Sequence, residues 1–242
     1  QRNSGLAVDG TCGPTTLQAL ARLRRSVTGG KPVAIREHEA IHRRGPTLAG
    51  KVVVVDPGHG GPDPGAVGHG LTEAEVVADL AARVEGRLSA HGARPFLTRP
   101  TQPPAGEPAP VVPDDDRRAD FANDADADLV VSLHVDRHAN PEARGVSTYY
   151  YGGDRHGAHS AVGERLAQLL QHEVVTRTDL LDCRTHARTW DLLRATRMPA
   201  VRLELGYLTN AGDAARLADP AFRDKVAEAV VAAITELYRP TD

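Results

Sequence analysis

Four side chains in this sequence have the types and the settings that a catalytic metal site requires. They are His59, Glu73, His134 and Glu204. Two imidazoles and one carboxylate suit zinc, and they leave a fourth tetrahedral position for water, as catalytic rather than structural zinc sites do. Zinc lowers the pKa of such a water toward about 7, so that hydroxide forms near neutral pH. The further carboxylate, Glu204, could then accept the proton and pass it on.

Each of these residues also has a structural interpretation. Glu73 would open a helix, where the helix dipole favours any acidic side chain. A single histidine at the end of a strand is usually hydrated or hydrogen-bonded at the surface. Glu204 lies in an apolar strand, where an unpaired carboxylate is costly, so an ion pair with Arg202 on the same strand face is a competing explanation. The hypothesis of a metal site therefore depends on the four side chains meeting at one place.

The elements that would bring these side chains together are predicted by hydrophobic periodicity. Strands are expected at 52–56, 94–98, 129–134, 146–151 and 200–205, and helices at 72–90, 116–127, 160–175, 190–195 and 221–238. This alternation predicts an α/β fold with a mostly parallel twisted sheet covered by helices on both faces. Ligands of such sheets bind beyond the carboxyl ends of the strands, which is where the candidate residues would gather.

By composition, the chain divides into three parts. Residues 51–242 carry the α/β pattern, and residues 25–50, rich in Gly, Arg and Pro, are interpreted as a linker with at most one helical turn. Residues 1–24 hold a glycine-rich turn and a short helix that starts near Pro14. Over residues 5–20 they read GL-x-x-DG-x-x-GP-x-T-x-x-AL, which resembles the back half of a peptidoglycan-binding repeat. We interpret them as a remnant of such a repeat, appended to the main domain.

Composition also argues against several kinds of partner. The net charge is −3, which offers no overall basic surface for nucleic acid. No apolar run approaches the roughly 20 residues of a membrane-spanning helix. The segment Gly58-x-Gly60 lacks the third glycine of a dinucleotide-binding loop.

Two distant cysteines, Cys12 and Cys183, do not make a disulfide framework, and the sequence leaves open whether they pair.

Four ordered motifs of the predicted domain resemble those of a known family. They are 54–61 (VVDPGHGG), 70–73 (GLTE), 127–136 (ADLVVSLHVD) and 199–210 (PAVRLELGYLTN). Together they are similar to the zinc-dependent N-acetylmuramoyl-L-alanine amidases, the cell-wall amidases of the LytC and AmiC kind. The resemblance implies that His59, Glu73 and His134 bind Zn²⁺ and that Glu204 is the catalytic acid/base. The implied reaction hydrolyses the amide between N-acetylmuramic acid and L-alanine in peptidoglycan or muropeptides.

The combination of this domain with a peptidoglycan-binding repeat is similar to the actinobacterial CwlM-type branch, which is associated with a cytoplasmic, regulatory role. Most of the family is found in the cell wall or outside the cell. No signal peptide opens this chain, but it begins within a motif, so the sequence does not decide its compartment. Arg202 stands where the family usually has an aliphatic residue, and its charge is expected to lower the pKa of Glu204. Arg202 and Asn210 are candidates for substrate binding.

These observations leave hypotheses from different classes. The leading one is a zinc amidase that acts on peptidoglycan. The alternative is a weakly active or inactive protein on the same scaffold that binds wall fragments or a cell-wall synthesis enzyme and regulates peptidoglycan synthesis. A zinc peptidase or deacetylase is disfavoured, because none of the helices predicted above carries an HExxH motif. The proline-rich segment 100–113 is expected to be an exposed loop that could lie over the site or bind a partner.

Overall fold

A computed structural model describes residues 8–26, 37, 41–42, 44–101, 112–153 and 158–239. Its strands are β1 (Val52–Pro57), β2 (Val67–Gly68), β3 (Leu71–Thr72), β4 (Arg94–Leu97), β5 (Leu129–Asp136), β6 (Val146–Tyr151), β7 (Asp182–Arg188) and β8 (Ala200–Tyr207). Its helices are α1 (Pro14–Ser26), α3 (Glu73–Ala90), α4 (Asp115–Asp124), α5 (Ala161–Arg177), α6 (Asp191–Ala195), α7 (Ala211–Ala218) and α8 (Pro220–Leu237).

The main domain is built on one six-stranded sheet with the order β4-β1-β5-β8-β6-β7. Strands β4, β1, β5 and β8 pair in parallel, whereas β6 pairs with β8 in the antiparallel sense and with β7 in parallel. All six residues of β1 are buried, as expected for a central strand covered on both faces. The predicted fold class, a mostly parallel sheet between helices, is confirmed.

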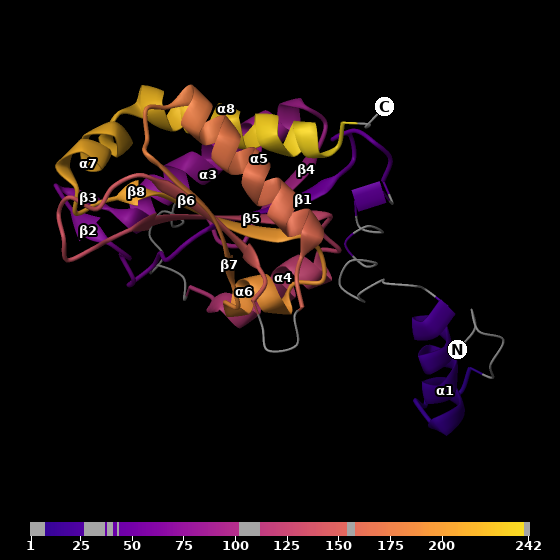
Figure 1. The fold of residues 1–242 in the computed structure, drawn as a ribbon. Coiled ribbons are helices and arrows are strands. Elements are labelled where there is room, and N and C mark those ends of the chain that lie inside the picture. Colours follow the sequence, from indigo (N-terminus) through magenta and orange to yellow (C-terminus); the bar gives the residue numbers. More distant parts are fainter. Residues whose placement is uncertain are drawn as a thin grey trace.

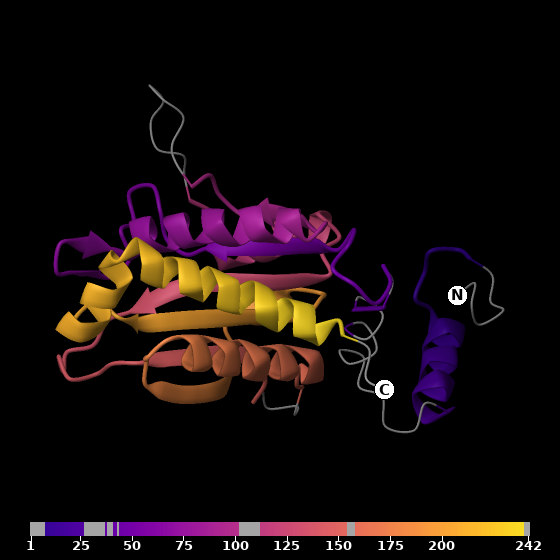
Figure 2. The same cartoon turned by 90° about the horizontal axis from the view of Figure 1, so that it is seen from above.

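Helices cover both faces of this sheet, so the domain has three layers (Figures 1 and 2). Helices α3, α5 and α8 pack on one face and bury the larger of two apolar clusters, which includes Val77, Leu170 and Ile234. The short helices α4 and α6 lie on the other face over a smaller cluster around Val54 and Val130.

The helix that follows β1 begins where its capping residues predict. Thr72 caps α3: its hydroxyl accepts from the backbone N–H of Glu75 at 3.3 Å and donates to the Glu75 carboxylate at 2.7 Å. This reciprocal pair is a capping box, and it sets Glu73 as the first residue of the helix. The short antiparallel pair β2–β3 leads into this cap and fixes the direction from which the chain enters α3.

Four elements differ from the expectations. The segment 57–70, in which no strand or helix was expected, contains β2, and β3 follows it. Strand β7 was missed because its sequence, DCRTHAR, shows no apolar alternation. It is an outer strand that pairs with only one neighbour in the described sheet. Helix α7 was missed because it is only eight residues long and contains a glycine, but its cap Asn210 marks its start.

The segments before the sheet contact it at several points. The Glu37 carboxylate accepts from the Ser160 hydroxyl at the start of α5, Leu48 is buried, and the buried Lys51 ammonium donates to the Ile41 carbonyl. Helix α1 starts at Pro14 as predicted and lies apart from the three-layered body in both views (Figures 1 and 2). The division of the chain into parts that end at residues 24 and 50 stays a prediction. Most of the expected linker lies outside the described residues, and so do residues 102–111 of the proline-rich loop.

Among the described residues, no helix is both long enough and apolar enough to cross a membrane.

Candidate metal centre

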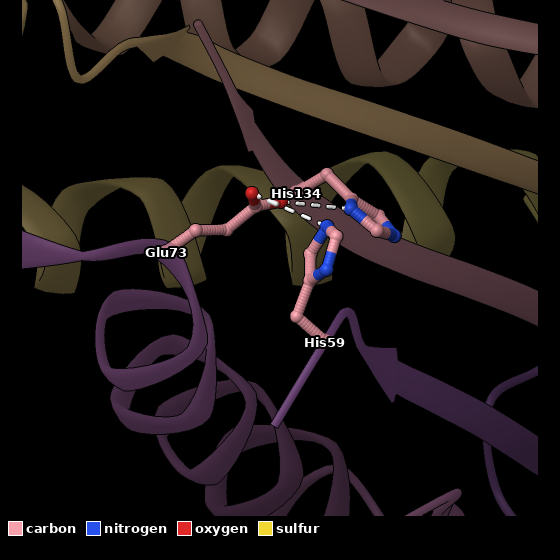
Figure 3. Close-up of side chains that lie close together, drawn as sticks. All are labelled: His59, Glu73 and His134. Carbon is pink, nitrogen blue, oxygen red and sulfur yellow. Dashed lines mark hydrogen bonds and ion pairs between the residues drawn. The ribbon is translucent and has the colours of Figure 1, made fainter. Parts of the chain in front are cut away.

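The side chains of His59, Glu73 and His134 converge from three different elements (Figure 3). His59 lies in the loop after β1, Glu73 opens α3, and His134 is in the last part of β5. One ligand atom from each lies within 4.8 Å of the others, which is a spacing that could hold a metal ion. The three predicted ligands are therefore brought together at the carboxyl edge of the sheet, as the strand-end argument requires.

The Glu73 carboxylate is the centre of this cluster. Its Oε1 accepts hydrogen bonds from His134 Nδ1 at 2.8 Å and from the backbone N–H of Val135 at 3.0 Å. Its Oε2 accepts from the backbone N–H of Ala66 at 2.8 Å and lies 3.3 Å from His59 Nε2. Two backbone amides therefore fix the carboxylate while both histidines face it. Glu73 is also the first residue of α3, where the helix dipole favours an acidic side chain. That structural role does not explain the contacts with the two histidines.

Asp63 fixes the ring of His59 from the other side. Its Oδ2 lies 2.7 Å from His59 Nδ1, and its Oδ1 accepts from the backbone N–H of Gly65 at 3.0 Å. A carboxylate on the second nitrogen of a metal-binding histidine sets the tautomer and the ring orientation. Sequence reasoning missed Asp63; its place four residues after His59 in the motif loop is the signal that could have found it.

Two glycines make room for the cluster. A Cβ atom on Gly58 would overlap the ring of His134. A Cβ on Gly65 would lie 2.5 Å from Glu73 Oε2 and 2.7 Å from a ring carbon of His59, and Gly65 also has a positive φ of 67°. Both positions therefore require glycine for steric reasons.

Two buried arginines hold the loop that carries His59. Arg99 donates to the carbonyls of Pro57 and Gly58 at 2.9 and 3.0 Å. Arg118 donates to the carbonyls of Pro57 and His59 at 3.0 and 3.2 Å. These contacts support a strained turn, since His59 itself has a positive φ of 55°. Neither arginine was expected from the sequence, because their partners are backbone atoms far away in the chain.

Glu204 lies beside the cluster on the next strand. It pairs with His134 in the β5–β8 register, and its residue is 7% exposed. Arg202 Nε donates to Glu204 Oε1 at 2.7 Å, so the competing ion pair is present. The other oxygen, Oε2, is buried and has no hydrogen-bond partner among the described residues. An orphaned carboxylate oxygen beside a set of metal ligands is costly in a purely structural role, which favours a function for it.

The electrostatics of the cluster shift the pKa values of its two carboxyl groups in opposite directions, down for Glu73 and up for Glu204. Burial alone would raise the pKa of Glu73, but hydrogen bonds from His134 and His59 hold it well below its usual range. The hydrogen bond with Glu73 raises the pKa of His59 to about 9 against the opposing effect of burial, and Asp63 adds to the rise. Burial raises the pKa of Glu204, and Arg202 offsets only part of that rise. Arg202 thus lowers this pKa as expected, but desolvation outweighs the ion pair, so the net shift of the Glu204 pKa is upward.

The remaining sequence candidates are placed as follows. Arg202 lines a cavity of about 220 Å³ together with His59, Glu73 and Glu204. Asn210 is instead the cap of α7: its side-chain oxygen accepts from the Gly212 and Asp213 amides, and its nitrogen donates to the Pro141 carbonyl at 2.7 Å. Its polar atoms are thus engaged in local structure. Both cysteines are free thiols.

Comparisons with known proteins agree with this geometry. The profile of the N-acetylmuramoyl-L-alanine amidase family matches residues 53–236. The chain is 45% identical to the N-acetylmuramoyl-L-alanine amidase CwlM of Mycobacterium tuberculosis over 98% of this chain and 57% of that protein. It is 30% identical to the amidase LytC of Bacillus subtilis over 87% of this chain and 40% of LytC. The chain therefore spans less than two thirds of the length of either relative.

Solved structures show the same architecture. The amidase AmiC2 of Nostoc punctiforme matches with a TM-score of 0.67 and 30% identity over 78% of this chain and 97% of that one. The catalytic domain of CwlV from Bacillus (Paenibacillus) polymyxa matches with a TM-score of 0.67 and 30% identity over 77% of this chain and 97% of that one. The matched family span includes the three converging ligands and Glu204, so the resemblance of the four motifs is confirmed, and the chain belongs to the N-acetylmuramoyl-L-alanine amidase family.

Proposed function

We propose that this protein hydrolyses the amide bond between N-acetylmuramic acid and L-alanine in peptidoglycan or its muropeptide fragments, with Zn²⁺ held by His59, Glu73 and His134. The observation that carries the proposal is the convergence of these three ligands within 4.8 Å beside a buried carboxylate with a free oxygen. Membership of the amidase family supports the choice of bond.

The donor set fits zinc better than magnesium or calcium. Two imidazoles and one carboxylate are typical zinc ligands and leave a coordination position open, whereas magnesium and calcium select oxygen ligands. Glu73 is already a carboxylate under neutral conditions, because its pKa is lowered. A bound zinc ion would polarise the substrate carbonyl and make water more acidic.

Glu204 has the geometry of a proton carrier. Its Oε2 is buried and free among the described residues, so it can accept a proton from the attacking water and donate it to the departing alanine amine. Burial raises its pKa, which brings a carboxyl group closer to the range in which it exchanges protons near neutral pH. Arg202 holds Oε1 at 2.7 Å and so fixes which oxygen remains available.

Metal analysis combined with a muropeptide digestion tests the proposal. We expect the purified protein to hold about one zinc per chain and to release stem peptides from muropeptides. Glu204→Gln should keep the metal and lose about 10²–10⁴-fold in hydrolysis, the usual contribution of general acid–base catalysis. Glu75→Gln, which changes the neighbouring capping carboxylate, is the control and should remain active. A zinc-loaded protein that releases no peptide from any peptidoglycan fragment would refute the proposal.

One observation favours a second candidate function. The ion pair between Arg202 and Glu204 occupies one oxygen of the proposed base. A protein in which this pair suppresses turnover could instead bind wall fragments or a cell-wall synthesis enzyme and regulate peptidoglycan synthesis. Retention of a synthesis enzyme by the immobilised protein, together with no hydrolysis by the zinc-loaded form, would support this second function. Full amidase activity would count against it.

A further inference from the structure

Arg202 is a charged side chain at the proposed site that has no assigned partner in the substrate. It lines two cavities beside the metal-ligand cluster, one shared with His59 and His134 and the other with Glu73 and Glu204. Its side chain is 24% exposed, whereas that of Glu204 is 9% exposed. Arg202 is therefore more accessible than Glu204 to a molecule that occupies these cavities.

The guanidinium group is held in place before any ligand arrives. Its Nε donates to Glu204 Oε1 at 2.7 Å, and its central carbon lies 4.7 Å from the ring centroid of Trp190. Trp190 packs in turn on Tyr149, with 4.7 Å between the ring centroids. Because one edge and one face of the guanidinium are occupied, little side-chain freedom remains to be lost when its other edge binds a ligand.

That other edge has no partner in the described part of the chain. The hydrogen bond and ion pair of Arg202 involve Nε, and no described residue accepts from Nη1 or Nη2. These two nitrogens form a planar fork whose spacing matches the two oxygens of a carboxylate. An arginine fork that opens into a cavity is thus prepared for a planar anion.

Acidic residues of the same cavities are engaged elsewhere. Asp63 accepts from Gly65 and contacts His59, Asp114 accepts from the backbone N–H of Arg117, and Asp136 accepts from the backbone N–H of Arg137. Asp115 also lines the cavity shared with His59 and His134. None of these four carboxylates pairs with Arg202, so among the described residues the fork is left available for a carboxylate of a ligand.

We propose that Arg202 binds a carboxylate on the stem-peptide residue that follows the alanine, and so selects stems with a free carboxylate there over stems with a carboxamide. This inference rests on the proposed amidase function. Arg202 lies next to Glu204, which would meet the alanine amine. Because the Cα atoms of consecutive residues lie about 3.8 Å apart, the residue after the alanine would come close to Arg202. A carboxamide presents one oxygen and an NH₂ group, and that NH₂ would face the N–H donors of the arginine.

Calorimetric titration of the metal-free protein tests this selection without requiring turnover. The probes are two synthetic N-acetylmuramoyl dipeptides that differ only in carboxylate or carboxamide on the second residue. We expect the carboxylate form to bind about 10- to 100-fold more tightly, as charge-assisted hydrogen bonds allow. Arg202→Leu should remove the difference, and Arg202→Lys, which keeps the charge but not the fork, should retain only part of it.

Arg188→Leu is the matched control. Arg188 also lies over an aromatic ring, with its guanidinium 5.3 Å from the Tyr149 centroid, but it lines neither cavity of the site. This variant should keep the full preference. Thermal unfolding checks that each variant folds, and Arg202→Gln replaces Arg202→Leu if the latter does not, because glutamine can still donate to Glu204.

Three results would overturn the inference: equal affinity of the unmutated protein for both dipeptides, no binding of either, or an unchanged preference in Arg202→Leu. Digestion of the same dipeptides by the zinc-loaded protein separates this inference from the proposed function. If the binding preference persists but no alanine amide is cleaved, the amidase proposal fails and the carboxylate site stands. If both dipeptides are cleaved and bound alike, the amidase proposal stands and the carboxylate site fails.

Discussion

The ring of His59 is held by an acid on each of its nitrogens. Asp63 lies 2.7 Å from Nδ1, and Glu73 lies 3.3 Å from Nε2. Only the second contact lies within the cluster of proposed ligands, so we expect Asp63 to act through His59 rather than on a metal. Such outer carboxylates raise the basicity of the ligand and fix its orientation. A single motif loop therefore supplies both a ligand and the residue that orients it.

Removal of the Asp63 carboxylate should weaken metal binding without unfolding the protein. In Asp63→Ala, the His59 ring loses its fixed tautomer, and we expect zinc affinity to fall about 10- to 100-fold. Competition with a chelator dye measures this affinity. Asp120→Ala, which removes an exposed acid of α4, should leave it unchanged. Equal zinc affinity of Asp63→Ala and the unmutated protein would show that Asp63 has no orienting role.

The close contact at Gly58 gives a second expectation for single residues. In Gly58→Ala, the added methyl group would overlap the His134 ring and push it out of the cluster. Zinc content per chain, measured by atomic emission, should therefore drop well below one. Gly86→Ala in α3 is the matched control, since a Cβ there meets no atom within 4 Å, and it should keep the metal. Full zinc content in Gly58→Ala would mean that the ring can move without loss of its role.

Motifs pointed to the candidate site residues but not to the residues that position them. The convergence of His59, Glu73, His134 and Glu204 could be predicted because these residues lie at the ends of predicted strands and a helix and suit one chemistry. Arg99 and Arg118 could not, because each holds backbone carbonyls more than 40 positions away, and no side-chain pattern records such contacts. The direction of the pKa shift of Glu204 could not be predicted from the sequence either, because it depends on how deeply the carboxyl group is buried.

At the scale of elements, one carboxylate ties together four segments. Asp56 at the end of β1 is fully buried, and it accepts hydrogen bonds from Ser132 in β5 at 2.6 Å and from Thr98 just after β4. It also forms an ion pair with Arg118 in α4. Burial by itself would raise the pKa of Asp56, but Arg118 and the two hydroxyls hold it below its usual value. Asp56 therefore aligns the loop of His59 with the rest of the sheet.

This arrangement predicts how stability depends on acid. A group whose pKa is lowered on folding stabilises the fold above its unfolded pKa of about 3.8, and this contribution is lost as the pH falls through the lower folded value. Asp56→Asn leaves the buried Arg118 unpaired and should cost about 3–5 kcal/mol at pH 7. The difference between the two proteins should shrink below the unfolded pKa. Urea unfolding at several pH values measures it.

Asp120→Asn serves as the control for this comparison, because Asp120 is exposed on α4 and should change the free energy of unfolding by less than about 0.5 kcal/mol. If the deficit of Asp56→Asn were the same at every pH, the carboxylate would not carry the charge that its surroundings imply.

Prediction of elements succeeded where apolar residues show the period of a strand or helix and failed where an element is short or polar. Strands β1, β5, β6 and β8 and helices α3, α5 and α8 could be found because their apolar residues repeat with the right period. Strand β7 is half-exposed and polar, so its extended shape depends on pairing with β6, which no local pattern encodes. The β2–β3 pair has only two residues in each strand, which is too short to show any period.

At the scale of the whole molecule, the proposed metal site joins the sheet to one of its covering helices. Its proposed ligands come from the β1 loop, α3 and β5, so metal binding would require the sheet and this helix to be in their native positions. Zinc should therefore stabilise the folded protein. At a free concentration about 100 times the Kd, the gain is about 2.7 kcal/mol, which corresponds to a rise in Tm of roughly 5–11 °C.

Differential scanning calorimetry with and without zinc measures this rise. His134→Ala should unfold at a temperature that zinc does not change, and magnesium should leave the unmutated protein unaffected because its ligand preference differs. A zinc-independent Tm in the unmutated protein would contradict a folded-state metal site.

The two outer strands of the sheet have a consequence for the behaviour of the protein in concentrated solution. β4 contains Pro95, which lacks a backbone donor, and β7 carries Arg184 and Arg188 along a polar strand. Proline and positively charged residues on the edge strands of a sheet hinder a strand of a second chain from pairing with that edge. Both outer strands of the described sheet therefore carry residues that disfavour cross-β aggregation of the folded chain.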